Sequence, residues 1–499
     1  MVFSSLEFIY LFMPPVLMVY FLLRFLKMET AIIWWLVVAS LSFYAWWSPP
    51  HLALLLGSIG FNYLIHKVLI KNRSKLIFIF GVTVNLSLLG LFKYADFLIG
   101  NFNVATGLTV NELGLILPLA ISFFTFQQIA YLHDTWSGKL VSSDFKRYLL
   151  FVSFFPQLIA GPIVMQKETI PQFKLKTFTN KTTLNFMLGS TLFFIGLFKK
   201  IVFADGMAPI ANAVFGAADA GQSIPMDAAW LGTFAYTFQI YFDFSGYCDM
   251  ALGLALLFGI RLPINFNSPY RALSIVDFWR RWHITLSHFL RDYLYIPLGG
   301  NRSGILGNKG NLIITMLLGG LWHGAGWNFI IWGGLHGSYL MINHYWGTSL
   351  GKQILQSATT EKVYCVLMWL ATMLAVVIAW VFFRAETFSG AIHVLTAMIG
   401  QTSVAANATP LVANLPNIVL YMTILTFIVA LLPNSIQITR NYRPVISVAK
   451  KVVQMKGWHR MLIWRPSPKW SFGIALIGIA GLIQIYRLNG LTEFIYFNF

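Results

Sequence analysis

Apolar runs long enough to cross a lipid bilayer as helices recur along the whole of this chain. Of its 499 residues, 57% are hydrophobic and only 10% are charged. A membrane-spanning helix needs about 20 predominantly apolar residues, and its backbone hydrogen bonds are all satisfied within the segment. The sequence therefore predicts an all-α polytopic membrane protein, and its composition excludes a soluble globule.

The expected spans cover most of the chain without a visible internal repeat. We expect a single integral-membrane domain over residues 1–499, with its core at about residues 120–345. The first apolar run lacks the basic flank and cleavage site of a signal peptide, so it is expected to remain as a span. The expected spans lie at about residues 7–26, 31–47, 51–70, 76–95, 112–132, 183–203, 228–260, 311–345, 363–383, 387–400, 416–432 and 470–486.

The net charge of +18 arises mainly from basic clusters between the spans. It is typical of membrane orientation, so no nucleic-acid partner is expected. Residues 433–469 contain eight Lys or Arg and no acid, which predicts a cytoplasmic segment, whereas the Asp-bearing residues 205–227 are predicted outside. Within the basic segment, Val445–Trp464 resembles an amphipathic helix held by anionic lipid. Lys199 and Lys200, near an outer end, fit this assignment poorly.

Three apolar segments do not have the pattern of a simple span. Residues 148–165 contain two prolines between basic flanks, which favours a re-entrant loop from the cytoplasm. Residues 228–260 are long and contain Asp243 and Asp249, which predicts a discontinuous helix. Residues 273–297 have basic neighbours and are predicted as a helix on the cytoplasmic side.

His323 is the clearest candidate for chemistry, because it lies within the apolar run 311–345. An ionisable group at membrane depth is costly unless it has a partner or a water-filled cavity, so a functional role is the default interpretation. The glycines around it remove side-chain bulk, which would let a ligand or another helix approach the imidazole. The alternative is a neutral histidine hydrogen-bonded inside a helix bundle. His336 is interpreted as a packing or rim residue, because its position thirteen residues after His323 places it far along the same helix.

The segment from Asp277 to Tyr293 is rich in arginine, histidine and tryptophan. On a continuous helix, Arg280, Ser287 and Arg291 would share one face. Arginines beside aromatic rings suit a phosphate-bearing nucleotide, since guanidinium groups bind phosphate bidentately. An interfacial helix with snorkelling arginines is an equally open alternative.

The chain has neither a nucleophile elbow, nor a phosphate-binding loop of the Gly-Lys-Ser/Thr type, nor zinc-ligand spacing, so no metal site is expected. Cys248 and Cys365 both lie in apolar stretches, which indicates neither a disulfide framework nor a reactive thiol. A general base remains: His323 could deprotonate a hydroxyl that attacks a bound thioester. A transporter or flippase is the alternative from another class, because such proteins also carry charged residues at membrane depth.

Several motifs resemble those of the membrane-bound O-acyltransferase superfamily, and within it the bacterial alginate O-acetyltransferase membrane subunits. The similarity extends over nearly the whole chain and is looser after about residue 345. The matching elements are Met1-Val-Phe-Ser-Ser, Ser122-Phe-Phe-Thr-Phe-Gln, Phe154-Phe-Pro-Gln-Leu-Ile-Ala-Gly-Pro162, Phe242-Asp-Phe-Ser-Gly-Tyr, the block Asn265–Arg302 with Phe278-Trp-Arg-Arg-Trp-His283, and Gly320-Leu-Trp-His323-Gly-Ala.

The resemblance implies that His323 is the essential histidine and that His283 is the second, usually polar, position. It also implies about 11–13 helices that cross or re-enter the bilayer around a central tunnel. Acetyl-CoA would be the acetyl donor from the cytoplasm, with no bound cofactor. The residues expected to bind the donor are Trp279, Arg280, Arg281, Ser287 and Arg291, and those expected to line the tunnel are Asp243, Ser245, Trp322, Trp327 and Asn328.

The resemblance further implies a multi-pass protein of the bacterial cytoplasmic (inner) membrane, surrounded by membrane lipids. Its acetyl groups would pass to an exopolysaccharide such as alginate through extracytoplasmic partner proteins. Cellulose and peptidoglycan are close alternatives as acceptors, and D-alanyl transfer to teichoic acid is a more distant relative.

Overall fold

The computed structural model describes residues 1–140, 144–302, 304–349, 358–401, 415–446, 457–487 and 494–495. In these residues the secondary structure is helical, with one isolated bridge between Pro263 and Ile446 and no strand. Within the described ranges, seven helices are long and apolar enough to cross a membrane, or eight if the bent pair Leu415–Leu431 and Ser435–Tyr442 forms one span. The predicted all-α polytopic membrane fold is therefore confirmed.

The helices follow one another along the chain, joined by connections of varied length. The first half contains α1 (Met13–Phe25), α2 (Glu29–Ala45), α3 (Pro49–Asn72), α4 (Lys75–Thr106), α5 (Ile121–Trp136), α6 (Phe145–Ser153), α7 (Phe155–Leu158), α8 (Gln166–Thr169), α9 (Leu175–Thr179), α10 (Thr182–Phe198), α11 (Asp205–Asp219) and α12 (Met226–Leu257). The second half contains α13 (Ile275–Trp279), α14 (Ile284–Leu290), α15 (Gly304–His323), α16 (Trp327–Ser349), α18 (Ala358–Arg384), α19 (Phe388–Met398), α20 (Leu415–Leu431), α21 (Ser435–Thr439) and α22 (Pro468–Arg487).

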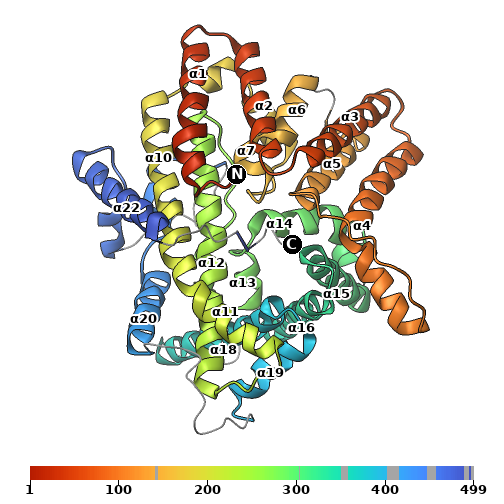
Figure 1. Ribbon diagram of the computed structural model, residues 1–499, viewed down its shortest axis with the longest axis vertical. Coiled ribbons are helices and arrows are strands. Elements are labelled where there is room, and N and C mark those ends of the chain that lie inside the picture. The colour runs from red at the N-terminus through yellow and green to blue at the C-terminus, as the bar shows by residue number, and fades with distance from the viewer. Residues whose placement is uncertain are drawn as a thin grey trace.

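The long helices are arranged around a centre that contains the short helices α13 and α14 (Figure 1). Helices α3, α4 and α5 form one side of this ring, and α10, α12, α20 and α22 form the opposite side (Figure 1). Helices α15, α16, α18 and α19 lie below the centre in this view, and α1, α2 and α6 lie above it (Figure 1). The large apolar side chains exposed on α1, α3, α4, α20 and α22 match the lipid-facing surface of a membrane protein.

Helix α12 is continuous, so the predicted interruption at residues 228–260 is wrong. Three ion pairs between two lysines and three aspartates explain why no break is needed. The Lys200 ammonium lies 2.7 Å from a carboxylate oxygen of Asp205 and 2.8 Å from one of Asp243. Lys199 lies 2.6 Å from Asp249. Both carboxylates of α12 are thus paired with a lysine of the adjacent chain segment, and Asp243 shares its lysine with Asp205. With these partners the helix keeps its own hydrogen bonds. The same pairs account for the two lysines that fitted the charge pattern poorly.

Close contact between α10 and α12 brings these charges together. A Cβ atom on Gly196 would lie 2.5 Å from the Gly246 carbonyl oxygen, and one on Gly253 would lie 2.5 Å from the Gly189 carbonyl oxygen. Only glycine permits such an approach of two helix backbones. The lysines that follow α10 therefore reach the aspartates of α12 directly.

The predicted single span 311–345 is also wrong, because the structure has two packed helices there. Helix α15 ends at His323, and α16 begins at Trp327 after Gly324, Ala325 and Gly326. Two glycines in a three-residue connection disfavour a continuing helix. The predicted run begins within α15 and ends within α16, and apolar periodicity alone does not show where the first helix ends and the second begins.

One further boundary differs from the prediction. The helix expected at 112–132 starts only at Ile121, because the Asp96 carboxylate accepts hydrogen bonds from the backbone N–H groups of Leu113 and Gly114 at 2.7 and 3.1 Å. These bonds hold the preceding segment against the end of α4. In the region 148–165, α6 and α7 are separated by Phe154 and are too short to cross a bilayer. Half of the expected surface helix Val445–Trp464 lies outside the described residues, at 447–456.

Candidate active site

His323 is the last residue of α15, and its side chain is buried, with 2% of the residue exposed. The glycines around it allow the hairpin of α15 and α16 to close. A Cβ atom on Gly320 would lie 2.2 Å from the Phe329 carbonyl oxygen, and one on Gly333 would lie 2.3 Å from that of Met316. Of the two explanations for these glycines, the structure supports close approach of a helix, which fixes where the imidazole lies.

Aromatic rings surround the His323 imidazole. The ring centroids of Trp322, Trp332 and Phe383 lie 4.8, 5.0 and 5.0 Å from its own. The His283 ring lies 6.5 Å away, and Trp322 contacts both imidazoles. The structure thus brings together the two histidines that the sequence singled out, although 39 residues separate them in the chain.

His283 lies in a turn between α13 and α14, so the predicted continuous helix over 273–297 is wrong. Its φ of 41° is in the left-handed region. The Asn265 side-chain oxygen lies 3.1 Å from the His283 Nδ1 and accepts hydrogen bonds from the backbone N–H and the hydroxyl of Thr285. The Asn267 N–H donates to the Arg281 carbonyl at 2.9 Å. The segment containing Asn265 and Asn267 thus supplies hydrogen-bond partners for backbone groups that a continuous helix would pair internally. The chain can therefore turn here without leaving those groups unpaired.

The residues expected to bind the donor are engaged mostly within the protein. The Trp279 indole donates to the His336 Nδ1 at 3.2 Å, and the Ser287 hydroxyl donates to the Trp279 carbonyl at 3.3 Å. The Arg281 guanidinium lies 2.9 Å from the Asp277 carboxylate, and that of Arg291 lies 2.7 Å from Asp292. Arg280 is exposed.

His336 is fully buried between Trp279 and Trp332, as expected of a packing residue.

Two cavities lie on either side of the histidine pair. The first has a volume of about 860 Å³ and includes Gly324, next to His323, and Phe383, which contacts its ring. It also includes Asn212, which belongs to the region predicted outside, and Arg384, whose guanidinium donates a hydrogen bond to the Asn212 side chain. We call it the outer cavity. Its lining residues are Phe92, Lys93, Phe97, Leu117, Ala208, Asn212, Tyr236, Gln239, Gly324, Ala325, Gly326, Trp327, Asn328, Phe329, Phe383, Arg384, Ala385, Glu386, Phe388 and Ile495.

The second cavity, which we call the inner cavity, has a volume of about 580 Å³. Its wall includes Thr285, whose hydroxyl donates a hydrogen bond to the Asn265 side chain that contacts His283. The wall also includes the basic residues Lys139, Lys167 and Arg291. These come from segments with the basic pattern of a cytoplasmic surface. Neither imidazole lines the outer or the inner cavity; each is one side chain removed from one of them. The pair therefore lies between two cavities whose lining segments are predicted on opposite sides of the membrane.

Only some of the predicted lining residues face these cavities. Trp327 and Asn328 line the outer cavity, and Arg291 lines the inner one. Asp243 and Ser245 are instead buried in α12, and Trp322 is buried between the histidines. Trp279, Arg280, Arg281 and Ser287 are not among the residues that line either cavity.

Lys93 is a site residue that the sequence analysis missed. Its ammonium donates to the Trp322 carbonyl and lies 3.5 Å from the His323 carbonyl and 3.4 Å from the Ser122 hydroxyl. The neighbouring Tyr94 hydroxyl donates to the Leu321 carbonyl at 2.9 Å. Helix α4 thus satisfies the last carbonyls of α15, which have no partner within their own helix. A lysine inside an apolar run was the available signal, as for His323.

Comparison with known proteins identifies the family. The model of the membrane-bound O-acyltransferase family matches residues 137–383, which include both histidines. The peptidoglycan O-acetyltransferase of Helicobacter pylori is 47% identical over 435 residues, covering 81% of each chain. The probable alginate O-acetylase AlgI of Pseudomonas aeruginosa is 42% identical over 410 residues, covering 80% of this chain and 75% of the relative. The teichoic acid D-alanyltransferase of Streptococcus thermophilus is 31% identical over 238 residues, covering 46% and 57%. These similarities support an acyltransferase over a transporter: the chain belongs to the membrane-bound O-acyltransferase family and is a multi-pass membrane O-acetyltransferase.

Proposed function

We propose that this enzyme takes acetyl groups from cytoplasmic acetyl-CoA and passes them to a hydroxyl acceptor on the outer side of the bacterial inner membrane. The observation that carries this proposal is the position of His283 and His323, 6.5 Å apart between the inner and outer cavities. A donor in the inner cavity and an acceptor in the outer cavity would approach the same pair of imidazoles from opposite sides. Holding the two reactants in the right orientation contributes much of the rate enhancement of an acyl transfer.

In the proposed reaction, His323 is the general base. A ring nitrogen accepts the proton of the acceptor hydroxyl while the hydroxyl oxygen attacks the thioester carbonyl. The new C–O bond forms and the C–S bond breaks, and the CoA thiolate recovers the proton from the imidazolium. General-base catalysis of this kind contributes roughly 10²–10⁴-fold in rate. His283, held by Asn265, would orient the donor or stabilise charge at the carbonyl.

Trp322 and Lys93 support this assignment of roles. Trp322 packs on both imidazoles, and the Lys93 ammonium contacts the backbone carbonyls of Trp322 and His323. Together they hold the catalytic end of α15 in one position. Lys93 also lines the outer cavity, where the acceptor would lie.

The proposed acceptor is a polysaccharide outside the membrane, acting with extracytoplasmic partner proteins that carry the acetyl group onward. Alginate was the expectation from the motifs, and relatives named as alginate O-acetylases are 40–42% identical. Peptidoglycan is a second candidate, since the relative named for it is 47% identical.

Two measurements test the proposal. Purified protein in nanodiscs is given acetyl-labelled acetyl-CoA, and free thiol and labelled product are followed with and without an acceptor. We expect thiol release that depends on His323; a protein that binds acetyl-CoA but never releases the thiol would contradict the proposal. Deletion of the gene in its source bacterium, with ester-linked acetyl measured in exopolysaccharide and in muropeptides separately, distinguishes the two acceptors.

A further inference from the structure

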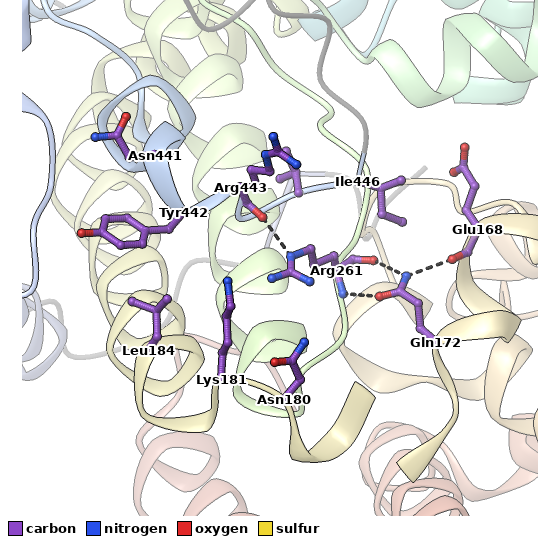
Figure 2. A pocket seen from close by; sticks show the side chains of 11 residues that line it. Glu168, Gln172, Asn180, Lys181, Leu184, Arg261, Asn441, Tyr442, Arg443 and Ile446 are labelled. Carbon is purple, nitrogen blue, oxygen red and sulfur yellow. Dashed lines mark hydrogen bonds between the residues drawn. The ribbon is translucent and has the colours of Figure 1, made fainter. Parts of the chain in front are cut away.

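A third cavity, of about 600 Å³, lies beside the inner cavity and has no role in the steps above (Figure 2). Four segments that are far apart in the sequence form it: the end of α8 with the turn after it, the start of α10, the residues after α12, and the residues after α21. Its lining residues are Glu168, Gln172, Asn180, Lys181, Leu184, Arg261, Asn441, Tyr442, Arg443, Val445 and Ile446. We call it the basic pocket.

A network of hydrogen bonds fixes the position of Arg261 in this pocket. The Gln172 side chain accepts from the Arg261 backbone N–H and donates to the Arg261 carbonyl, both at 2.9 Å. It also donates to the Glu168 carbonyl at 2.9 Å. The Arg261 Nε–H donates to the Arg443 carbonyl at 2.9 Å (Figure 2). These bonds hold the stem of the arginine, and its two terminal NH₂ groups are not part of the network.

The charge of the pocket is strongly positive. Lys181, Arg261 and Arg443 line it against a single acid, Glu168. Figure 2 shows the Glu168 carboxylate at the far end from Lys181, pointing away from the Arg261 guanidinium. In the part of the chain that the structure describes, these three cations form no ion pair with a carboxylate. Burial lowers the pKa of the half-buried Arg261, which indicates an unfavourable environment for a cation without an anion.

The basic pocket adjoins the cavity assigned to the donor. Glu168 and Ile446 line both cavities, and the Ile446 N–H donates to the Leu262 carbonyl at 3.0 Å in the wall between them. All three cations come from segments whose charge pattern predicts the cytoplasmic side. A long ligand from the cytoplasm with an anionic end could therefore occupy both cavities at once.

We propose that Lys181, Arg261 and Arg443 form a phosphate-binding site for the nucleotide end of the acyl donor, whose thioester arm would extend through the inner cavity toward His283. Guanidinium groups suit phosphate oxygens, which they bind bidentately. In this proposal these three cations, and not Arg280 and Arg281 as expected from the sequence, make the main contact with the donor phosphates. The proposal rests on the proposed function, because it takes a CoA thioester as the donor. An anionic lipid headgroup would supply the same phosphate chemistry, so the experiment must separate the two sources.

The experiment measures binding without turnover. The full-length protein is placed in nanodiscs of phosphatidylcholine, and 3′-phosphoadenosine 5′-diphosphate, the nucleotide part of CoA, is titrated at fixed salt. We expect Arg261→Gln and Lys181→Gln each to raise Kd at least about tenfold, because each removes a charged hydrogen-bond donor to phosphate. Lys71→Gln is the matched control: Lys71 is an exposed cation in the last turn of α3, and it lines none of these cavities. Its Kd should equal that of the wild type.

A second arm tests the lipid source. Native mass spectrometry after reconstitution with phosphatidylglycerol reports whether a lipid is retained by the wild type and lost from Arg261→Gln. Loss of lipid with unchanged nucleotide Kd would overturn the assignment to the donor and reassign the phosphate site to lipid. No change in either measurement, in variants that elute as the wild type does on gel filtration, would overturn the site altogether. Wild-type protein that binds the nucleotide but transfers no acetyl would refute the proposed function and leave the site intact.

Discussion

Replacing His323 by glutamine separates its chemistry from its packing. Glutamine keeps a polar side chain of similar length but cannot accept a proton as imidazole does. If His323 is the general base, kcat should fall by roughly 10²–10⁴-fold, the usual contribution of such a group. At 1.36 kcal/mol for each factor of ten, this raises the activation barrier by about 3–5 kcal/mol.

The structure shows why alanine is the weaker choice at this position. The imidazole is buried and in contact with the rings of Trp322, Trp332 and Phe383. Truncation to alanine would leave a cavity among them and cost about 2–5 kcal/mol of folding stability, as for other buried large-to-small changes. A loss of activity in His323→Ala could then reflect a displaced α15 as well as a missing base.

His336→Gln is the matched control, because His336 is equally buried and packs on the same Trp332. Thiol release from saturating acetyl-CoA gives kcat, and unfolding in detergent gives stability. We expect the two glutamine variants to unfold similarly and only His323→Gln to lose two or more powers of ten in kcat. The reasoning is refuted if folded His323→Gln keeps more than a tenth of the activity, or if His336→Gln loses as much.

Four further changes test the surroundings of the site. His283→Gln should reduce initial rates by less than His323→Gln, and unchanged rates across donor concentrations would mean that His283 only shapes its turn. Lys200→Met should lower the free energy of unfolding, measured by SDS titration, by about 3–5 kcal/mol, because it leaves two buried carboxylates without their cation. Lys199→Met should cost less, since Asp249 also accepts a hydrogen bond from Ser435, and equal losses would argue against the cluster. Lys93→Met should lower kcat and leave KM for acetyl-CoA nearly unchanged, because Lys93 contacts the end of α15; a rise in KM alone would place it at the donor.

The sequence by itself determined the class of fold and the candidate catalytic pair. Apolar runs of spanning length show up in composition and periodicity, because the bilayer imposes a length on each helix. His323 stood out for the same reason, since an ionisable group in an apolar run is costly and rarely without a role. The motifs around His283 and His323 then indicated the family, which the comparisons confirmed.

Tertiary structure decided which polar groups meet, and this overturned several local predictions. Asp243 and Asp249 looked like a break in α12 only because the lysines that neutralise them come from another segment. The turn at His283 depends on Asn265, 18 residues earlier, whose hydrogen bonds replace those of a continuous helix. Helix periodicity describes one segment at a time, whereas the free energy of a buried charge or an unpaired carbonyl depends on neighbours from anywhere in the chain. The basic pocket likewise has no signal in any single segment, because it exists only where four of them meet.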